Sequence, residues 1–120
     1  MDETRQQQIE ALKVAGPYCG KIITAINKII GEYSGNRLPD TDKYLESILN
    51  GLNWIFGVYN GTKELINEKE TIVDKDIVNK SVQMLNKANQ DNDDALRVEA
   101  LKGVLSFVEV FKAEADRLAN

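Results

Sequence analysis

The sequence predicts an all-α fold, an antiparallel up-down-up-down four-helix bundle, on the basis of three observations. Apolar residues recur every three or four positions along four separate stretches, the spacing that lines one side of an α-helix. Clusters of glycine, asparagine, aspartate or proline separate these stretches. The alternation of apolar and polar residues that is typical of strands is almost absent. We therefore expect one helical domain over residues 1–120, with short connections.

The strongest pattern lies in residues 45–66, which we expect to form the centre of the second helix. Trp54 is the large side chain that lies off its apolar stripe. Gly51, Gly57 and Gly61 lie inside the same helix, where each costs roughly 1 kcal/mol relative to alanine. A helix with this composition must be held in place by its neighbours. The stripe consists of Leu45, Ile48, Leu52, Ile55, Tyr59, Thr62 and Ile66, with Leu49 and Phe56 beside it.

The first helix is expected over residues 5–34, and it contains a proline. Pro17 must remove one hydrogen bond of the helix and press on the carbonyl group of Lys13. The helix either restarts at Pro17 or continues with a kink near it. We favour one kinked helix, because the stripe keeps its phase, and Gly16 and Gly20 would let another helix approach closely. The stripe is Ile9, Leu12, Gly16, Cys19, Ile23, Ile26, Ile30 and Tyr33, widened by Ile22 and Ile29.

Turn signals separate the remaining helices. A glycine signal at 34–37 ends the first helix, and Asp40 or a neighbour is expected to cap the second. After a charged connector at 68–70, the segment 71–74 reads as the entry to a short third helix, capped by Asp74. The acidic turn at 89–94 leads into the fourth helix, which Asp93 or Asp94 would cap. The last two stripes are Val78, Val82, Leu85 and Ala88, then Leu101, Val104, Val108, Phe111, Ala115 and Leu118.

The second and fourth helices resemble each other when Gly51 is aligned with Gly103. One interpretation is two helical hairpins related by a pseudo-two-fold axis. The other is that two amphipathic helices can always be slid into such a register. The matched pairs include Leu49 with Leu101, Leu52 with Val104, and Tyr59 with Phe111.

Composition excludes several classes of function. Hydrophobic residues make up 42% and charged residues 28% of the chain. Its net charge of −4 gives no electrostatic attraction to the phosphate backbone of a nucleic acid. We therefore expect no nucleic-acid binding. The chain has no apolar run of the length that spans a bilayer, and its N-terminal residues lack the apolar core of a signal peptide, so we expect a cytoplasmic protein from a prokaryote or a comparable reducing compartment. Cys19 cannot form an internal disulfide, and its place on the first stripe makes it a small core residue before a reactive thiol.

The chain contains no recognisable catalytic, cofactor or metal motif. It has no histidine, so the Glu-x-x-His pairs of di-iron bundles cannot form. The acidic turn fails as a calcium loop, because Ala95, Leu96 and Lys102 stand where an oxygen ligand, a glycine and a glutamate are needed. No base is linked by a motif to a serine or cysteine nucleophile. We therefore assign no catalytic, cofactor-binding or metal-binding residue, expect no cofactor, and lean against an enzyme.

Trp54 is the residue most suggestive of binding. Its side chain should lean toward the N-terminal end of its helix, over Asn50 and a trough left by Gly51. Tryptophan is enriched among binding hot spots, although the edge of a wide core stripe would also bury one. Val14 and Tyr18 add to the apolar residues beyond the four stripes. The expected interaction surface comprises Trp54, Gly51, Val58, Phe107 and Val110.

The segment 48–56, ILNGLNWIF, resembles the central L-x-G-[IL]-x-W-[IL] run of small, acidic, uncharacterised helical proteins of Gram-positive bacteria. Some of those proteins are loosely labelled chaperone-like. In size and helicity the chain is also similar to flagellar export chaperones, although it lacks their N-terminal signature. The resemblance implies a bacterial cytoplasmic helical protein without known chemistry.

Two hypotheses of function follow from these observations. The first is a non-enzymatic protein-interaction or chaperone-like bundle that binds a partner protein or itself, for example as a homodimer through the second and fourth helices. The alternative is a small-ligand-binding or enzymatic bundle with an internal pocket. An internal pocket needs polar groups that reach the core, and the sequence offers Tyr33, Tyr59 and Thr62 for this.

Overall fold

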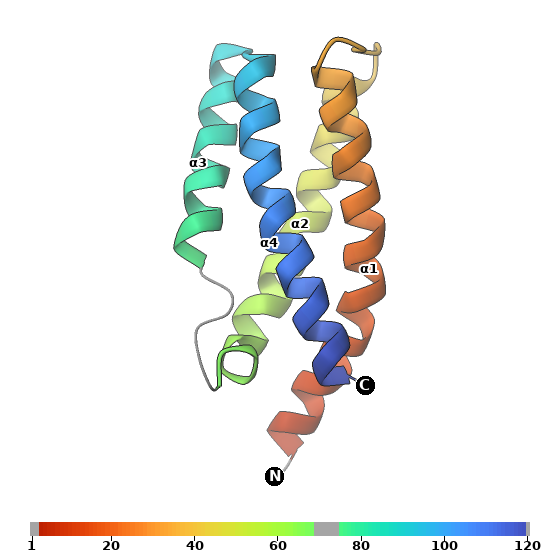
Figure 1. The fold of residues 1–120 in the computed structure, drawn as a ribbon, viewed down its shortest axis with the longest axis vertical. Coiled ribbons are helices and arrows are strands. Elements are labelled where there is room, and N and C mark those ends of the chain that lie inside the picture. Colours follow the sequence, from red (N-terminus) through yellow and green to blue (C-terminus); the bar gives the residue numbers. More distant parts are fainter. Residues whose placement is uncertain (1–2, 69–74, 120) are drawn as a thin grey trace.

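The computed structural model describes residues 3–68 and 75–119, and within these ranges every regular element is an α-helix. The helices are α1 (Glu3–Tyr33), α2 (Thr41–Ile66), α3 (Lys75–Asp91) and α4 (Asp94–Ala119). Successive helices run in opposite directions, which confirms the expected up-down-up-down bundle (Figure 1). The expected entry segment at 71–74 and the cap at Asp74 lie outside the described residues.

The stripes predicted for α2 and α4 form the core of the bundle. Every residue of the α2 stripe is buried, and so is the α4 stripe from Leu101 to Ala115. In α1 the buried line differs from the prediction, because Ile22 and Ile29 are buried while Ile23 and Ile30 are only partly covered. A strict three-four spacing has a period of 3.5 residues, whereas a helix of 3.6 residues per turn rotates away from that line over several turns.

Helix α1 is one helix that runs through Pro17, as the favoured interpretation predicted. Its N-terminal turns lean away from the line of the rest of the helix (Figure 1). Lys13 and Pro17 are both exposed, so the carbonyl group that loses its helical partner faces solvent. Gly16 lies directly beneath the Asp116 side chain of α4, which confirms the close helix approach expected there.

The turns at one end of the bundle follow their sequence signals in part. Gly35 has φ of 130°, the left-handed backbone expected where α1 ends. Asp93 caps α4, since its carboxylate accepts a hydrogen bond of 3.1 Å from the backbone N–H of Leu96. Asp40 occupies the N-cap of α2 without a side-chain cap bond. Its neighbour Thr41 ties the turn instead, because its hydroxyl accepts a bond of 2.8 Å from the backbone N–H of Leu38.

The helices pack in the order α2, α1, α4, α3. Helix α4 lies against both α1 and α3, α1 also lies against α2, and α2 and α4 touch over a short length where they cross (Figure 1). Over their described residues, the backbones of α2 and α3 do not pack against each other. Helices α1 and α4 are therefore in close contact along the bundle, whereas the backbones of α2 and α3 are separated.

The similarity of α2 and α4 holds for the aligned glycines Gly51 and Gly103, but it does not extend to a two-fold symmetry of the bundle. At Gly51, an added Cβ would lie 2.5 Å from the Tyr18 hydroxyl oxygen of α1. At Gly103, an added Cβ would collide with Ser81 of α3. In each hairpin, a glycine of the second helix thus leaves space for a side chain of the first helix. A pseudo-two-fold axis would also pair α2 with α3 as α1 pairs with α4, and that contact is missing among the described residues.

Candidate functional site

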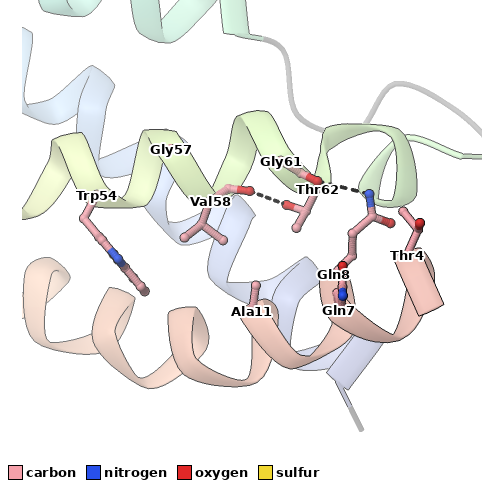
Figure 2. A pocket seen from close by; sticks show the side chains of 9 residues that line it. All are labelled: Thr4, Gln7, Gln8, Ala11, Trp54, Gly57, Val58, Gly61 and Thr62. Atoms are coloured by element: carbon pink, nitrogen blue, oxygen red, sulfur yellow. Dashed lines mark hydrogen bonds between the residues drawn. The ribbon is translucent and has the colours of Figure 1, made fainter.

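A groove runs between the N-terminal half of α1 and the second half of α2, and we call it the Trp54 groove. Figure 2 shows Trp54 projecting from α2 toward α1 at one end, while the Gln8 amide of α1 donates a bond of 3.0 Å to the Gly61 carbonyl at the other. Its volume is about 480 Å³ and its lining is uncharged. The lining residues are Thr4, Gln7, Gln8, Ala11, Trp54, Gly57, Val58, Gly61 and Thr62.

Trp54 is 44% exposed and is held by one aromatic contact. Its ring meets the Tyr18 ring edge to face, with centroids 5.1 Å apart and planes at 80°. The expected trough over Gly51 is filled by Tyr18 and Ile22 of α1, so the indole does not lie in it. The missing Cβ of Gly51 makes room for the Tyr18 phenol, and Tyr18 then supports the indole from the α1 side.

The five residues of the expected interaction surface do not form one patch. Trp54 and the half-buried Val58 line the groove, and Gly51 is buried beneath α1. Phe107 is only 6% exposed and lies on the side of α2 that faces α3. Val110 is 40% exposed on α4. A single binding surface on α2 therefore has Trp54 and Val58 as its members, with Phe107 and Val110 elsewhere.

Two glycines of the groove have no packing role inside the described chain. A Cβ added at Gly57 or Gly61 would meet no atom within 4 Å, unlike one at Gly51 or Gly103. Glycine within a helix costs roughly 1 kcal/mol relative to alanine, so both positions weaken α2 without serving its own packing. They leave the backbone of α2 bare along the groove, one helical turn apart.

Alanine substitutions should separate these two kinds of glycine. We expect Gly57→Ala to raise the free energy of unfolding by about 0.5–1 kcal/mol through helix propensity. Gly103→Ala should lower it by about 1–3 kcal/mol, because the new methyl group collides with Ser81. Urea denaturation of the two variants beside the wild type measures both. A loss of stability in Gly57→Ala would mean that an internal contact requires this glycine.

A second hollow, the aromatic cleft, lies between α2 and α3 where their backbones separate. Its volume is about 260 Å³. Phe107 of α4 forms part of its floor, with ring centroids 5.5 Å from Phe56 and 5.4 Å from Tyr59. The cleft is lined by Asn53, Phe56, Tyr59, Lys75, Val78, Asn79, Val82 and Phe107.

A cluster of ionic groups joins the two turns at the opposite end of the bundle from the N-terminus. Arg97 is 5% exposed, and its guanidinium group donates to Asn89 at 2.8 Å, Asn92 at 3.1 Å and Asp94 at 2.6 Å. Arg37, from the turn between α1 and α2, donates to Asp94 at 3.1 Å. This cluster was not predicted from the sequence. Its signal was present, because Arg97 lies four residues before Leu101 on the same stripe.

Tyr33 and Asp42 complete this cluster from the other hairpin. The guanidinium groups of Arg37 and Arg97 lie 5.4 and 5.1 Å from the centre of the Tyr33 ring. Burial, together with the hydrogen bond of 2.8 Å that its hydroxyl donates to Asp42, raises the pKa of Tyr33. Hydrogen bonds from Arg37 hold the pKa of Asp42 and that of Asp94 below their usual value. The charges here are satisfied by one another, which indicates a structural clamp between the two turns.

The clamp should make the fold sensitive to acid. Asp42 and Asp94 have lowered pKa values in the folded state, so they stabilise it above the ordinary carboxylate pKa of about 3.8. This stabilisation is lost as the pH falls through and below that value. We expect the urea midpoint to drop between about pH 5 and pH 3, and to drop less in an Asp42→Asn, Asp94→Asn double variant. An equal acid-induced drop in both proteins would contradict the assignment.

Cys19 lies in the core, and the described residues hold no cluster of metal ligands. Cys19 is fully buried, and desolvation raises the pKa of its thiol to about 11, which suits the core role expected for it. No group of three or more Asp, Glu, Cys or His side chains is placed to hold a metal ion in residues 3–68 and 75–119. In the same residues, every helix is too short or too polar to cross a membrane.

Comparison with known protein families places the chain in one family. A family model described as "Domain of unknown function (DUF8042)" matches residues 10–113, which is most of the chain. The chain belongs to the DUF8042 family. No curated protein and no solved structure matches it significantly.

The residues that match the DUF8042 model include part of the lining of the Trp54 groove and leave the rest outside. All of α2 lies inside the matched range, and with it Trp54, Gly57, Val58 and Gly61. Thr4, Gln7 and Gln8 of α1 precede the range. The α2 wall of the groove, the aromatic cleft and Arg97 therefore belong to the part of the chain that the DUF8042 model covers.

Proposed function

We propose that this protein is a non-enzymatic interaction module whose Trp54 groove receives an amphipathic helix of a partner protein. The observation that supports the proposal best is the half-exposed Trp54 at the end of an uncharged groove. Tryptophan combines a large apolar area with little conformational entropy, which is why it is frequent at binding hot spots. Tyr18 already orders its ring, so binding would cost little further ordering.

The shape of the groove favours a helix as its occupant. Gly57 and Gly61 place no side chain in the groove, so the backbone of a partner helix could come close at Gly57, while Gln8 binds the carbonyl of Gly61. From Trp54 to Thr62 the wall extends about 12 Å at the rise of an α-helix, which matches two turns of a partner. A docked helix would place a small residue on the glycines and a larger apolar residue against Trp54 and Val58.

The uncharged lining makes recognition depend on shape and apolar contact. A chaperone-like role fits this proposal, because it consists in covering the apolar face of a partner's helix. The cytoplasmic location and bacterial origin expected from the sequence belong to the same proposal. A homodimer is the rival occupant, with a second copy of the chain in place of the partner.

The test measures binding to the wild type, Trp54→Ala and a matched control. Val110→Ala is the control, because Val110 is exposed to a similar extent on α4, away from the groove. Proteins captured from a native cell lysate are identified, and their helical segments are made as peptides. Trp54 is the only tryptophan of the chain, so its fluorescence reports peptide binding to the wild type and to Val110→Ala, and calorimetry measures the affinity of all three proteins.

We expect Trp54→Ala to weaken peptide binding by about 2–4 kcal/mol, or about 30- to 1000-fold, while its fold and melting temperature change little. Free Trp54 should emit at long wavelength and be open to quenchers, and the peptide should shift and protect it. Capture that is insensitive to Trp54→Ala, or equally sensitive to Val110→Ala, would overturn the proposal. Light scattering that shows a dimer abolished by Trp54→Ala would make a second copy the occupant instead.

A further inference from the structure

The aromatic cleft between α2 and α3 is a second hollow with a different chemistry from the Trp54 groove. The two hollows share no lining residue and lie on opposite sides of α2, one facing α1 and the other facing α3. What binds in one is therefore independent of what binds in the other, and the inference below does not rest on the proposed function.

The floor of the cleft is made of aromatic rings. Phe107 is almost fully buried, and the rings of Phe56 and Tyr59 flank it at centroid distances of 5.5 and 5.4 Å. The Tyr59 ring stands nearly perpendicular to that of Phe107, at 80°. Rings in tilted and perpendicular arrangements present both edges and faces, which suits a further ring placed among them. Val78 and Val82 of α3 complete an apolar wall on the other side.

The rim of the cleft is polar and carries a positive charge. Asn53, Asn79 and Lys75 are the polar residues among those that line the cleft, and Lys75 is the charged one. The Lys75 ammonium donates to the neutral amide oxygen of Asn60 at 3.0 Å. Among the described residues, no carboxylate lines the cleft. Some lysines on other helical faces are paired with acids, as Lys87 is with Asp91 and Lys112 with Asp116.

We propose that the aromatic cleft binds a small aromatic carboxylate, a single ring with a short acidic arm. The ring packs among Phe56, Tyr59 and Phe107, and the carboxylate reaches the Lys75 ammonium and the rim amides. A cleft of about 260 Å³ has room for one ring and not for a long acyl chain. Lys75 is the charged residue among the lining residues that the structure describes, and its ammonium group can pair with the anion.

The test is a titration of the isotope-labelled full chain with phenylacetate, followed by the backbone amide signals in NMR spectra. Phenylacetamide is the neutral control of the same shape, and octanoate carries the same charge without a ring. We expect saturable shifts centred on Asn79, Val82 and Phe107, with phenylacetamide and octanoate each weaker by about tenfold or more. The fluorescence of Trp54 should stay unchanged, which separates this site from the Trp54 groove.

Two variants and one matched control test which residues of the cleft contact the ligand. Lys75→Met should weaken phenylacetate by about tenfold and leave phenylacetamide unaffected, since one charge-assisted contact is lost. Lys80→Met, an exposed lysine of α3 that does not line the cleft, is the matched control and should change neither affinity. Asn79→Phe places a ring in the cleft from an exposed position and should abolish both.

The proposal is overturned if phenylacetate gives no saturable shifts at millimolar concentrations. It is equally overturned if phenylacetamide binds as well as phenylacetate, if octanoate binds better, or if Lys80→Met has the effect of Lys75→Met. Binding that persists in Asn79→Phe would place the ligand elsewhere.

Discussion

Leu52→Ala is expected to lower the free energy of unfolding by about 2–5 kcal/mol, one of the two largest effects that we predict for this chain. Leu52 is 1% exposed at the centre of the α2 stripe. Its removal would leave a cavity that packed neighbours fill only partly. For a domain whose total stability is of the order of 5–15 kcal/mol, such a loss is severe. Urea denaturation followed by circular dichroism measures it.

Val110→Ala is the control for Leu52→Ala. It also shortens an apolar side chain, but from an exposed position on α4, and we expect a change below about 0.5 kcal/mol. A loss below about 1 kcal/mol in Leu52→Ala would mean that the α2 stripe does not form the core.

Arg97→Ala is expected to cost about 2–3 kcal/mol, because it removes a buried side chain together with its three hydrogen bonds at once. Its guanidinium group holds Asn89, Asn92 and Asp94, and it lies over the Tyr33 ring. Without it, Asn89, Asn92 and Asp94 lose the donor that links them, and the buried space of the Arg97 side chain is left unfilled. Thermal and urea unfolding measure the loss.

Arg117→Ala is the matched control on the same helix. Arg117 pairs with Glu114 at 2.7 Å, but its side chain is largely exposed, so we expect a change within about 0.5 kcal/mol. Arg97→Lys should recover only part of the stability, since an ammonium group cannot reproduce the planar fork of a guanidinium. Equal effects of Arg97→Ala and Arg117→Ala would show that the cluster does not clamp the turns.

These contacts have a consequence for the Trp54 groove. Its two walls, α1 and α2, are held at the turn end by the ionic cluster and in the middle by Tyr18 seated on Gly51. Further along, Gln8 of α1 bonds to the Gly61 carbonyl. The groove is thus a largely pre-formed feature of the hairpin, which reduces the cost of ordering on binding.

Much of the site could be read from the sequence, and part of it could not. The helical period placed Trp54 off the buried stripe of α2, and the indole is half exposed. The same period placed Phe107 beside the buried stripe of α4, as a candidate for binding. In the structure Phe107 is almost fully buried and forms part of the floor of the aromatic cleft. Periodicity shows how wide an apolar face is, but it does not show which neighbouring helix covers each edge of that face.

The four helices, their antiparallel order and the core stripe of α2 could be derived from the sequence, which also favoured a continuous α1 through Pro17. These features follow from local rules: the period of apolar residues, turn chemistry and the length of the connections. Three features became visible only in the folded chain: Tyr18 fills the space over Gly51, Arg97 clamps two turns, and the backbones of α2 and α3 stay apart. The physical reason is that hydrophobic burial is not directional, so the same stripes can be buried by several arrangements of helices. Side chains that are distant in sequence, such as Arg37 and Asp94, then select among those arrangements.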